Sequence, residues 1–316
     1  MIEVRGLTKR FGQHIAVNNI NFTVSDGEIL GFLGPNGAGK TTTMNIMTGY
    51  IAATEGDVTI NGADIIAEPE KAKMNIGYLP EQPPLYGDMK VDEYLRFICD
   101  IKKVKRSVRK KMMADIKESV KISDMSQRLV KNLSKGYKQR VGLAQAMIGY
   151  PKVIIMDEPT VGLDPKQIIE MRDVIRKLGK KHTVILSSHI LSEVSAVCDR
   201  VMIINKGKIV ASDTTEKLSS SLTEGKAISI RLKTDKQYAQ SVISQSSLIK
   251  ESKFEGSKEP GTIDMVLSGD ENVDIREAVF QCMAKNNIPI LQMKSLDLTL
   301  EEIFLQITGG EGGSER

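Results

Sequence analysis

The chain has 316 residues, of which 41% are hydrophobic and 27% are charged, and its formal net charge is +4. This composition is that of an ordinary globular protein of about two domains, and so mild a charge does not require a nucleic-acid partner. No apolar run approaches the roughly 20 residues that span a bilayer, and a strand-like segment stands where a signal peptide would start. We therefore expect any membrane role to depend on a partner. The three scattered cysteines form no CxxC pair, which indicates free thiols rather than a disulfide framework.

The first segments of the chain indicate a small antiparallel β layer, with strand-like stretches at Ile2–Arg5, Asn21–Val24 and Asp57–Ile60. Helical patterns at Lys40–Met47 and Lys166–Leu178 follow short apolar runs. Five such runs have the length and composition of buried strands: Ile29–Leu33, Ile76–Leu79, Val153–Met156, Thr183–Leu186 and Val201–Ile204. This alternation of strands and helices predicts an α/β domain with a largely parallel central sheet.

A phosphate-binding loop is predicted at residues 34–41, whose sequence GPNGAGKT fits the P-loop pattern GxxxxGK[ST]. Average residue usage gives this pattern by chance in about one chain in a hundred of this length. The glycines let the backbone curl so that successive N–H groups face phosphate oxygens, and the following helix adds its partial positive charge. Lys40 supplies a cation for the β- and γ-phosphates, and the Thr41 hydroxyl can bind Mg²⁺. The nucleotide-binding residues predicted here are Gly34, Asn36, Gly37, Gly39, Lys40, Thr41 and Thr42.

Two acidic residues, Asp157 and Glu158, end the apolar strand Val153–Met156. Charges are costly at the end of a buried strand unless something pairs with them. We expect Asp157 to bind Mg²⁺. Glu158 should point elsewhere, because side chains alternate along a strand, and act as the general base on the attacking water. Such a pair could also be a solvated strand end, and the P-loop upstream is what favours the catalytic interpretation.

Further motifs in a fixed order make residues 1 to about 212 resemble the ABC ATPase family. Leu133-Ser134-Lys135-Gly136-Tyr137 stands at the place of the family's LSGGQ signature, just upstream of Asp157. The remaining matches are Phe11 for the aromatic that stacks on adenine, Gln82 for the Q-loop, Asp164 for the D-loop and His189 for the switch histidine. The resemblance implies a P-loop NTPase fold of the ABC ATPase type, in which a mixed sheet carries a helical subdomain.

The resemblance also implies a role for each matched residue. Phe11 would stack on the adenine, and His189 would contact the γ-phosphate. Gln82 would contact Mg²⁺ or the attacking water, while Asp164 would lie at a dimer interface. The family works as a head-to-tail dimer that holds two ATP molecules between P-loop and signature. One set of motifs is present here, so a second copy of the chain or a paralogous ATPase is needed.

The signature segment would bind the γ-phosphate of a nucleotide held by the other subunit, through Ser134 and Gly136. Physically, Ser134 precedes the helix-like run Lys138–Ile148, so its hydroxyl and the nearby N–H groups can form a second anion site. Lys135 replaces the family's first signature glycine, and Tyr137 replaces its glutamine. We expect Lys135 to point to solvent rather than to add a cation near phosphate. Hydrolysis should survive both changes, because Ser134 and Gly136 are kept.

A change in composition near residue 212 predicts three parts: an ATPase domain over 1–212, an accessory α+β domain over 213–308 and a disordered tail over 309–316. The accessory domain is predicted from three strand-like and two helix-like stretches: Ile228–Leu232, Thr262–Leu267, Ile288–Met293, Val273–Lys285 and Thr299–Ile307. The ending DLTLEEIF at 297–304 resembles accessory domains of ATPases that serve ABC-2-type exporters, of which the gliding-motility ATPases look nearest. We expect a dimerisation or regulatory role for this domain, with a structural cap as the alternative.

These features predict an ATP-hydrolysing motor subunit of an ABC-type exporter that uses ATP and Mg²⁺. Its expected partner is an integral-membrane permease of the ABC-2 type, and its expected location is cytoplasmic, peripheral on the inner face of the cell membrane. The alternative is an ABC ATPase that acts on nucleic acid or ribosomes. Chromosome members carry coiled-coil inserts and translation members usually carry two cassettes. The sequence shows neither feature, so no nucleic acid is expected as a partner.

Two other classes of protein are less consistent with the sequence. A GTPase switch would need the guanine-reading NKxD motif, but the stretch Asn205-Lys206-Gly207-Lys208 lacks its Asp. A non-hydrolysing, ATP-gated binding module would not need both Glu158 and His189.

Overall fold

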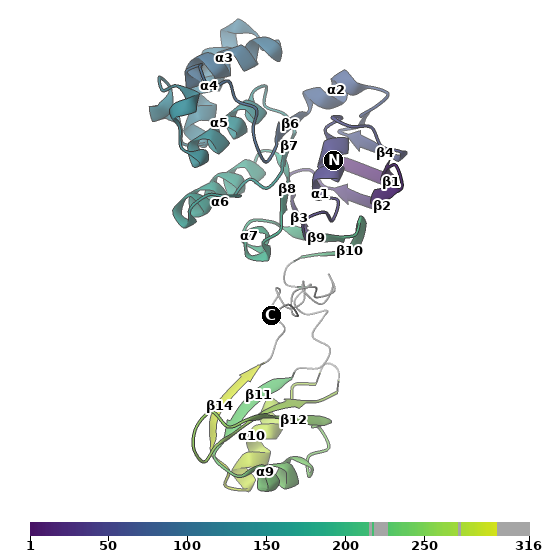
Figure 1. Ribbon diagram of the computed structural model, residues 1–316, viewed down its shortest axis with the longest axis vertical. Helices are drawn as coiled ribbons and strands as arrows, with labels where there is room; N and C mark the ends of the chain where they lie inside the picture. Colours follow the sequence, from purple (N-terminus) through teal and green to yellow (C-terminus); the bar gives the residue numbers. More distant parts are fainter. Residues whose placement is uncertain (215–216, 218–226, 271–272, 296–316) are drawn as a thin grey trace. The chain divides into compact units, whose positions relative to one another are not determined.

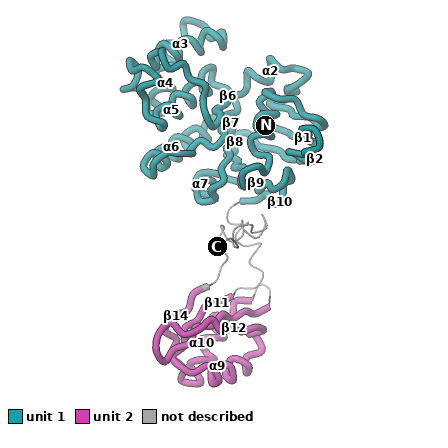
Figure 2. The backbone as a smooth tube through the Cα atoms, in the orientation of Figure 1, with its two compact units in different colours: residues 1–215, 307–316 teal, residues 216–306 magenta. Residues whose placement is uncertain are grey.

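The computed structural model describes residues 1–214, 217, 227–270 and 273–295. They belong to two compact units that divide between residues 215 and 216 (Figure 2). The helix expected at 299–307, the ending at 297–304 and the tail expected at 309–316 lie outside the described residues. Within the described ranges, no helix is both long enough and apolar enough to cross a bilayer.

The centre of the first unit is a six-stranded sheet made of β3 (Ile29–Leu33), β6 (Ile76–Leu79), β7 (Val153–Met156), β8 (Thr183–Ser188), β9 (Arg200–Asn205) and β10 (Lys208–Asp213). The strand order is β10-β9-β3-β8-β7-β6, and every neighbouring pair is parallel except the edge pair β9–β10. All residues of β3, β7 and β8 are buried, as in parallel sheets that are covered on both faces. The predicted α/β fold with a largely parallel sheet is confirmed.

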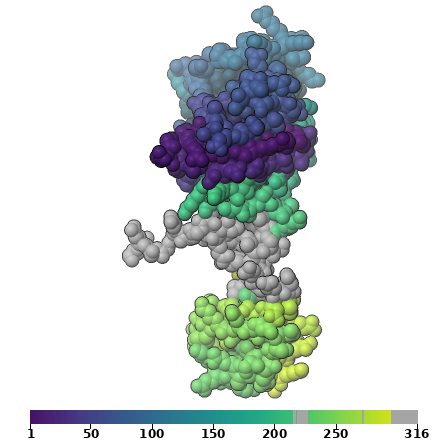
Figure 3. All heavy atoms as spheres, turned by 90° about the vertical axis from the view of Figure 1, so that its right-hand side faces the viewer, coloured from purple at the N-terminus to yellow at the C-terminus, as the bar shows by residue number. Residues whose placement is uncertain are grey.

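A second sheet covers part of this core, with the order β2-β1-β4-β5 and antiparallel pairing. Its strands are β1 (Ile2–Phe11), β2 (His14–Val24), β4 (Glu55–Ile60) and β5 (Ala63–Asp64). Side chains from this layer and from the central sheet share one hydrophobic core. The purple band in Figure 3 shows β1 and β2 on the surface of the unit. The antiparallel layer was predicted, but its first two strands are longer than expected and form a hairpin.

Helices cover the central sheet and extend beyond its β6 edge (Figure 1). They are α1 (Lys40–Met47), α2 (Pro69–Met74), α3 (Val91–Ile101), α4 (Arg106–Ser119), α5 (Lys135–Met147), α6 (Pro165–Gly179) and α7 (Leu191–Ser195), with 3₁₀ turns at Ser123–Met125 and Val130–Asn132. Helices α3, α4 and α5 pack together as a helical subdomain, and α5 also packs against β6. Helix α5 begins three residues earlier than the expected run because Ser134 caps it.

The second unit is a four-stranded antiparallel sheet with two helices. Its elements are β11 (Ile228–Leu232), α9 (Lys236–Ile243), β12 (Glu251–Gly256), β13 (Ile263–Ser268), α10 (Arg276–Lys285) and β14 (Ile290–Ser295). The strand order β12-β13-β11-β14 in a βαββαβ chain is the split βαβ arrangement of ferredoxin-like domains. Alternate residues of β11 point into a core that they share with α9, α10 and β13. The unit is therefore α+β, and α9 and β12 are elements that the sequence did not indicate.

Candidate nucleotide site

The P-loop connects β3 to α1 and needs its glycines for steric reasons. Gly37 and Gly39 have φ angles of 78° and 107°, in the left-handed region that favours glycine. A Cβ atom on Gly39 would also lie 2.5 Å from the carbonyl oxygen of Ala16. A Cβ atom on Gly34 would collide with the carbonyl oxygen of Ile204. The loop therefore keeps a tight curl at the carboxyl end of β3, directly before the N-terminus of α1.

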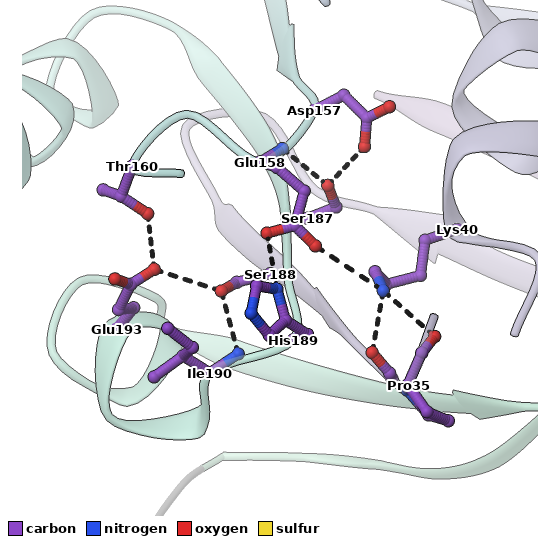
Figure 4. Close-up of polar contacts among 11 residues, drawn as sticks. Pro35, Lys40, Asp157, Glu158, Thr160, Ser187, Ser188, His189, Ile190 and Glu193 are labelled. Carbon is purple, nitrogen blue, oxygen red and sulfur yellow. Dashed lines mark hydrogen bonds and ion pairs between the residues drawn. The ribbon is translucent and has the colours of Figure 1, made fainter. Parts of the chain in front are cut away.

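Lys40 is folded back onto this loop and is only 6% exposed. Its ammonium donates to the carbonyl oxygens of Gly34, at 2.7 Å, and Pro35, at 3.2 Å. The same nitrogen lies 3.6 Å from Oε1 of Glu158 (Figure 4). Burial lowers the pKa of Lys40, and the Glu158 carboxylate partly offsets this effect. An anion in the loop would favour the charged form of the lysine.

The two carboxylates at the end of β7 have different partners. Asp157 accepts a hydrogen bond from the hydroxyl of Ser187 at the end of β8. Glu158 has a φ angle of 47°, and its backbone N–H donates to the same hydroxyl at 2.8 Å. The Glu158 carboxylate instead faces Lys40 on one side and His189 on the other, with Oε2 lying 3.0 Å from His189 Nδ1 (Figure 4). The structure thus brings Lys40, Glu158 and His189 together.

Three residues expected to bind the metal line one cavity of about 750 Å³: Thr41 from α1, Gln82 from the loop after β6, and Asp157, which directly follows β7. Each offers oxygen: a hydroxyl, an amide oxygen and a carboxylate. Mg²⁺ prefers such ligands and usually keeps several waters besides one or two protein ligands. The described residues contain no cluster of three or more His, Cys, Asp or Glu side chains that could hold a metal ion. These residues suit a nucleotide-bound Mg²⁺ better than a metal held by protein alone.

The remaining P-loop and adenine candidates lie around the same loop. Asn36 is exposed within the P-loop, and Thr42 is half-buried in the first turn of α1. Phe11 ends β1 and is 51% exposed, and the Lys9 ammonium lies 5.0 Å from its ring centroid. Its ring therefore remains available to a planar ligand.

The signature residues lie elsewhere in the unit, beside the start of α6. Ser134 caps α5 by accepting from the Tyr137 N–H at 3.4 Å. A Cβ atom on Gly136 would lie 2.6 Å from the Gln167 amide oxygen. Asp164 caps α6 by accepting from the Gln167 N–H at 2.8 Å. Among the described residues, no hydrogen bond or ion pair joins this group to the P-loop.

Lys135, which departs from the family signature, has an exposed side chain whose ammonium lies against Gly162. Gly162 precedes Asp164 by two residues and has a φ angle of 68°. A Cβ atom on Gly162 would collide with the Lys135 ammonium. The exposed side chain agrees with the prediction that Lys135 points to solvent, and its end runs along the D-loop segment.

Sequence reasoning missed four polar residues beside the carboxylates. Ser187 holds Asp157 and the Glu158 backbone, and a second group joins Thr160, Ser188 and Glu193. Ser187 and Ser188 stand directly before His189. Two hydroxyl side chains at the end of a buried strand could therefore have indicated a polar network here. Glu193 gives no such signal, because a single acid in a helical pattern normally indicates a solvated face.

Comparison with known proteins places this site in a family. The ABC transporter family model matches residues 17–161, which include the P-loop, the signature and both carboxylates. The uncharacterized ABC transporter ATP-binding protein YhcH of Bacillus subtilis is 35% identical, and the alignment covers 98% of this chain and 96% of that protein. The chain belongs to the family of ABC transporter ATP-binding proteins. The predicted family and ATP-binding function are confirmed.

Other relatives of this ABC protein agree. The bacitracin transport ATP-binding protein BcrA of Bacillus licheniformis is 30% identical, with 98% of each chain covered. A solved ATP-binding subunit of an ABC transporter is 27% identical and has a TM-score of 0.64 over 70% of this chain and 92% of that one. A dimeric bacterial ABC transporter cassette, 24% identical, has a TM-score of 0.62 over 68% of this chain and 98% of that one, and shows the same fold.

Proposed function

We propose that this ABC ATPase is the motor subunit of an exporter and hydrolyses ATP through Glu158. It would work as a nucleotide-sandwich dimer on a separate permease of the ABC-2 type, at the inner face of the cell membrane. The observation that carries the proposal is the grouping of Lys40, Glu158 and His189 at the mouth of the P-loop. Relatives named for bacitracin transport and linearmycin resistance align with 98% of this chain, which supports export.

Nucleotide binding would begin with a change of partner at Lys40. Its ammonium now donates to two carbonyl oxygens of its own loop. Phosphate oxygens carry more charge than those carbonyls and would take their place, because hydrogen bonds between charged groups are the stronger ones. The N–H groups of the curled loop and the N-terminus of α1 would bind the same phosphates. Phe11 would hold the adenine by stacking.

The metal that accompanies ATP would be held by Thr41, Asp157 and Gln82, which share one cavity. Mg²⁺ supplies charge neutralisation at the phosphate oxygens. Ser187 would keep the Asp157 carboxylate in place through its hydroxyl. Gln82 is exposed in its loop, so its contact would depend on how that loop is held.

Glu158 would take a proton from the attacking water at its carboxylate. Its backbone is fixed by the Ser187 hydroxyl, and its side chain lies between Lys40 and His189. The Nδ1 atom of His189 would hold the Glu158 carboxylate. The other ring nitrogen, Nε2, would then face the γ-phosphate. General bases of this kind typically contribute about 10²–10⁴-fold to the rate.

The second subunit would complete the phosphate site. Ser134 and Gly136 make no polar contact with the P-loop of their own chain in the part that the structure describes. The Ser134 hydroxyl and the free N–H groups at the start of α5 form an anion site that needs a nucleotide from elsewhere. A two-fold dimer pairs each signature with the partner's P-loop, because a symmetric interface repeats every contact.

The assignment of the base is tested by Glu158→Gln, which keeps the size of the side chain and removes its basicity. We expect kcat for ATP to fall by about 10²-fold or more while nucleotide binding is retained. The matched control is Glu70→Gln on α2, where the acid is exposed and should be silent. Turnover by Glu158→Gln at the wild-type rate would contradict the proposal.

A further inference from the structure

The Glu193 carboxylate on α7 is buried next to the proposed active site without a cation. Only 7% of the residue is exposed. It accepts a hydrogen bond from the Thr160 hydroxyl and another, at 3.1 Å, from the Ser188 hydroxyl. In the described ranges no Lys, Arg or His side chain forms an ion pair with it. An unpaired buried carboxylate is costly, so these two hydroxyls are its main compensation.

The two hydroxyl donors come from the segments that carry the proposed catalytic pair. Thr160 follows Glu158 by two residues in the loop after β7. Ser188 ends β8 and directly precedes His189. The Ser188 hydroxyl also accepts from the Ile190 N–H at 3.0 Å, which fixes the turn that follows His189. Glu193 therefore joins the two segments at a point next to each catalytic residue.

This network is separate from the one that faces the phosphates. Figure 4 shows Glu193 bonded to Thr160 and Ser188, while Glu158 contacts His189 and Lys40. No hydrogen bond joins Glu193 to the P-loop lysine or to either catalytic side chain in the described part of the chain. Its action on catalysis must therefore pass through the two hydroxyls.

We propose that Glu193 is a positioning residue that clamps the loop after β7 to the end of β8. The clamp keeps Oε2 of Glu158 beside Nδ1 of His189, at the 3.0 Å seen here. Glu193 itself never touches nucleotide. The inference rests on the catalytic roles proposed above for Glu158 and His189. Misplacement of a catalytic group by about 1 Å can cost about 10²-fold in rate, so a clamp of this kind has a measurable effect.

The test is steady-state ATP hydrolysis by the full chain carrying Glu193→Ala. We expect kcat to fall by about 10- to 100-fold and KM for ATP to change by less than about threefold. KM should change little because the nucleotide-binding P-loop and Phe11 are not altered, whereas kcat depends on the position of the catalytic groups. Glu193→Gln should stay within about threefold of wild type, since its amide can still bond both hydroxyls. Ser192→Ala, an exposed change on the same helix, is the matched control.

A mutant cycle separates the clamp from a general loss of packing. The double variant Thr160→Val with Ser188→Ala keeps Glu193 but removes both of its donors. It should reproduce most of the kcat loss of Glu193→Ala, and combining all three changes should add little. This variant also serves if Glu193→Ala fails to fold. Fully additive losses, a wild-type kcat in the double variant, or equal losses for Glu193→Gln and Glu193→Ala would each overturn the clamp.

Failure of this inference can be told from failure of the proposed function. If Glu158→Gln still hydrolyses ATP, the general base is wrong whatever Glu193 does. If Glu158→Gln is inactive while Glu193→Ala keeps a wild-type kcat, the clamp alone is wrong.

Discussion

At the scale of single residues, Phe11 offers the plainest prediction. Its ring ends β1 with half of its surface in solvent and contributes little to the core. Base–aromatic stacking contributes about 1–3 kcal/mol, so Phe11→Ala should raise KM for ATP by about 5- to 150-fold. The kcat of Phe11→Ala should stay at the wild-type value, because no catalytic group moves. Phe11→Tyr keeps an aromatic ring and should behave as wild type. Steady-state kinetics with ATP give both values, and an unchanged KM for the alanine variant would contradict the stacking role.

Residues inside a short motif could be predicted, whereas their long-range partners could not. The P-loop was readable because its glycines and lysine stand within eight positions of one another. The contact between Lys40 and Glu158 joins residues far apart in sequence, and it depends on the order of strands in the sheet. Glu193 was missed because its burial comes from the packing of α7, which leaves no pattern in the sequence.

At the scale of elements, the start of α6 links a helix cap to the signature. Asp164 caps α6 through the Gln167 N–H, and the Gln167 side chain covers Gly136. Asp164→Ala should destabilise this helix end by about 0.5–2 kcal/mol, whereas Asp164→Asn should cap nearly as well.

Hydrogen exchange of the first α6 amides measures this difference. Intrinsic tryptophan fluorescence would not serve, because the protein has no tryptophan. Faster exchange in the alanine variant alone is the expected result. Equal exchange in both variants would show that the Asp164 side chain does not hold the helix. If Asp164→Asn keeps the cap but weakens ATP-dependent dimerisation, the carboxylate has a separate role at the interface.

Elements marked by a short apolar run or by a neighbouring motif were predicted closely, and polar ones were not. The bounds expected for β3, β6, β7, β11 and α1 agree with the structure. Strand β12 was missed because five of its six residues are exposed and it shows no apolar alternation. The prediction for strand β1 ended too early because Gly6 interrupts the apolar pattern. Gly6 has a φ of 57°, and the pairing of β1 with β2 shifts register at this point.

At the scale of the whole molecule, the parallel sheet explains why distant motifs meet. The P-loop follows β3, the two carboxylates follow β7 and His189 follows β8, so all stand at the carboxyl ends of parallel strands. Ligands of open α/β sheets bind at this edge. The sequence could indicate the strands and their type, but their order depends on how the crossovers pack, which local patterns do not contain.

The central claim is that each ATP is held by the P-loop of one chain and the signature of another. It is tested by mixing two variants that are each expected to be inactive. Lys40→Ala removes the P-loop lysine, and Ser134→Arg blocks the signature segment. Each variant alone should lack turnover, since neither homodimer has an intact composite site. An equimolar mixture should recover about a quarter of wild-type activity, because half of the dimers are mixed and each has one intact site of two. Recovery near this level is the predicted result, and full activity of Ser134→Arg alone or no recovery on mixing would contradict the paired sites.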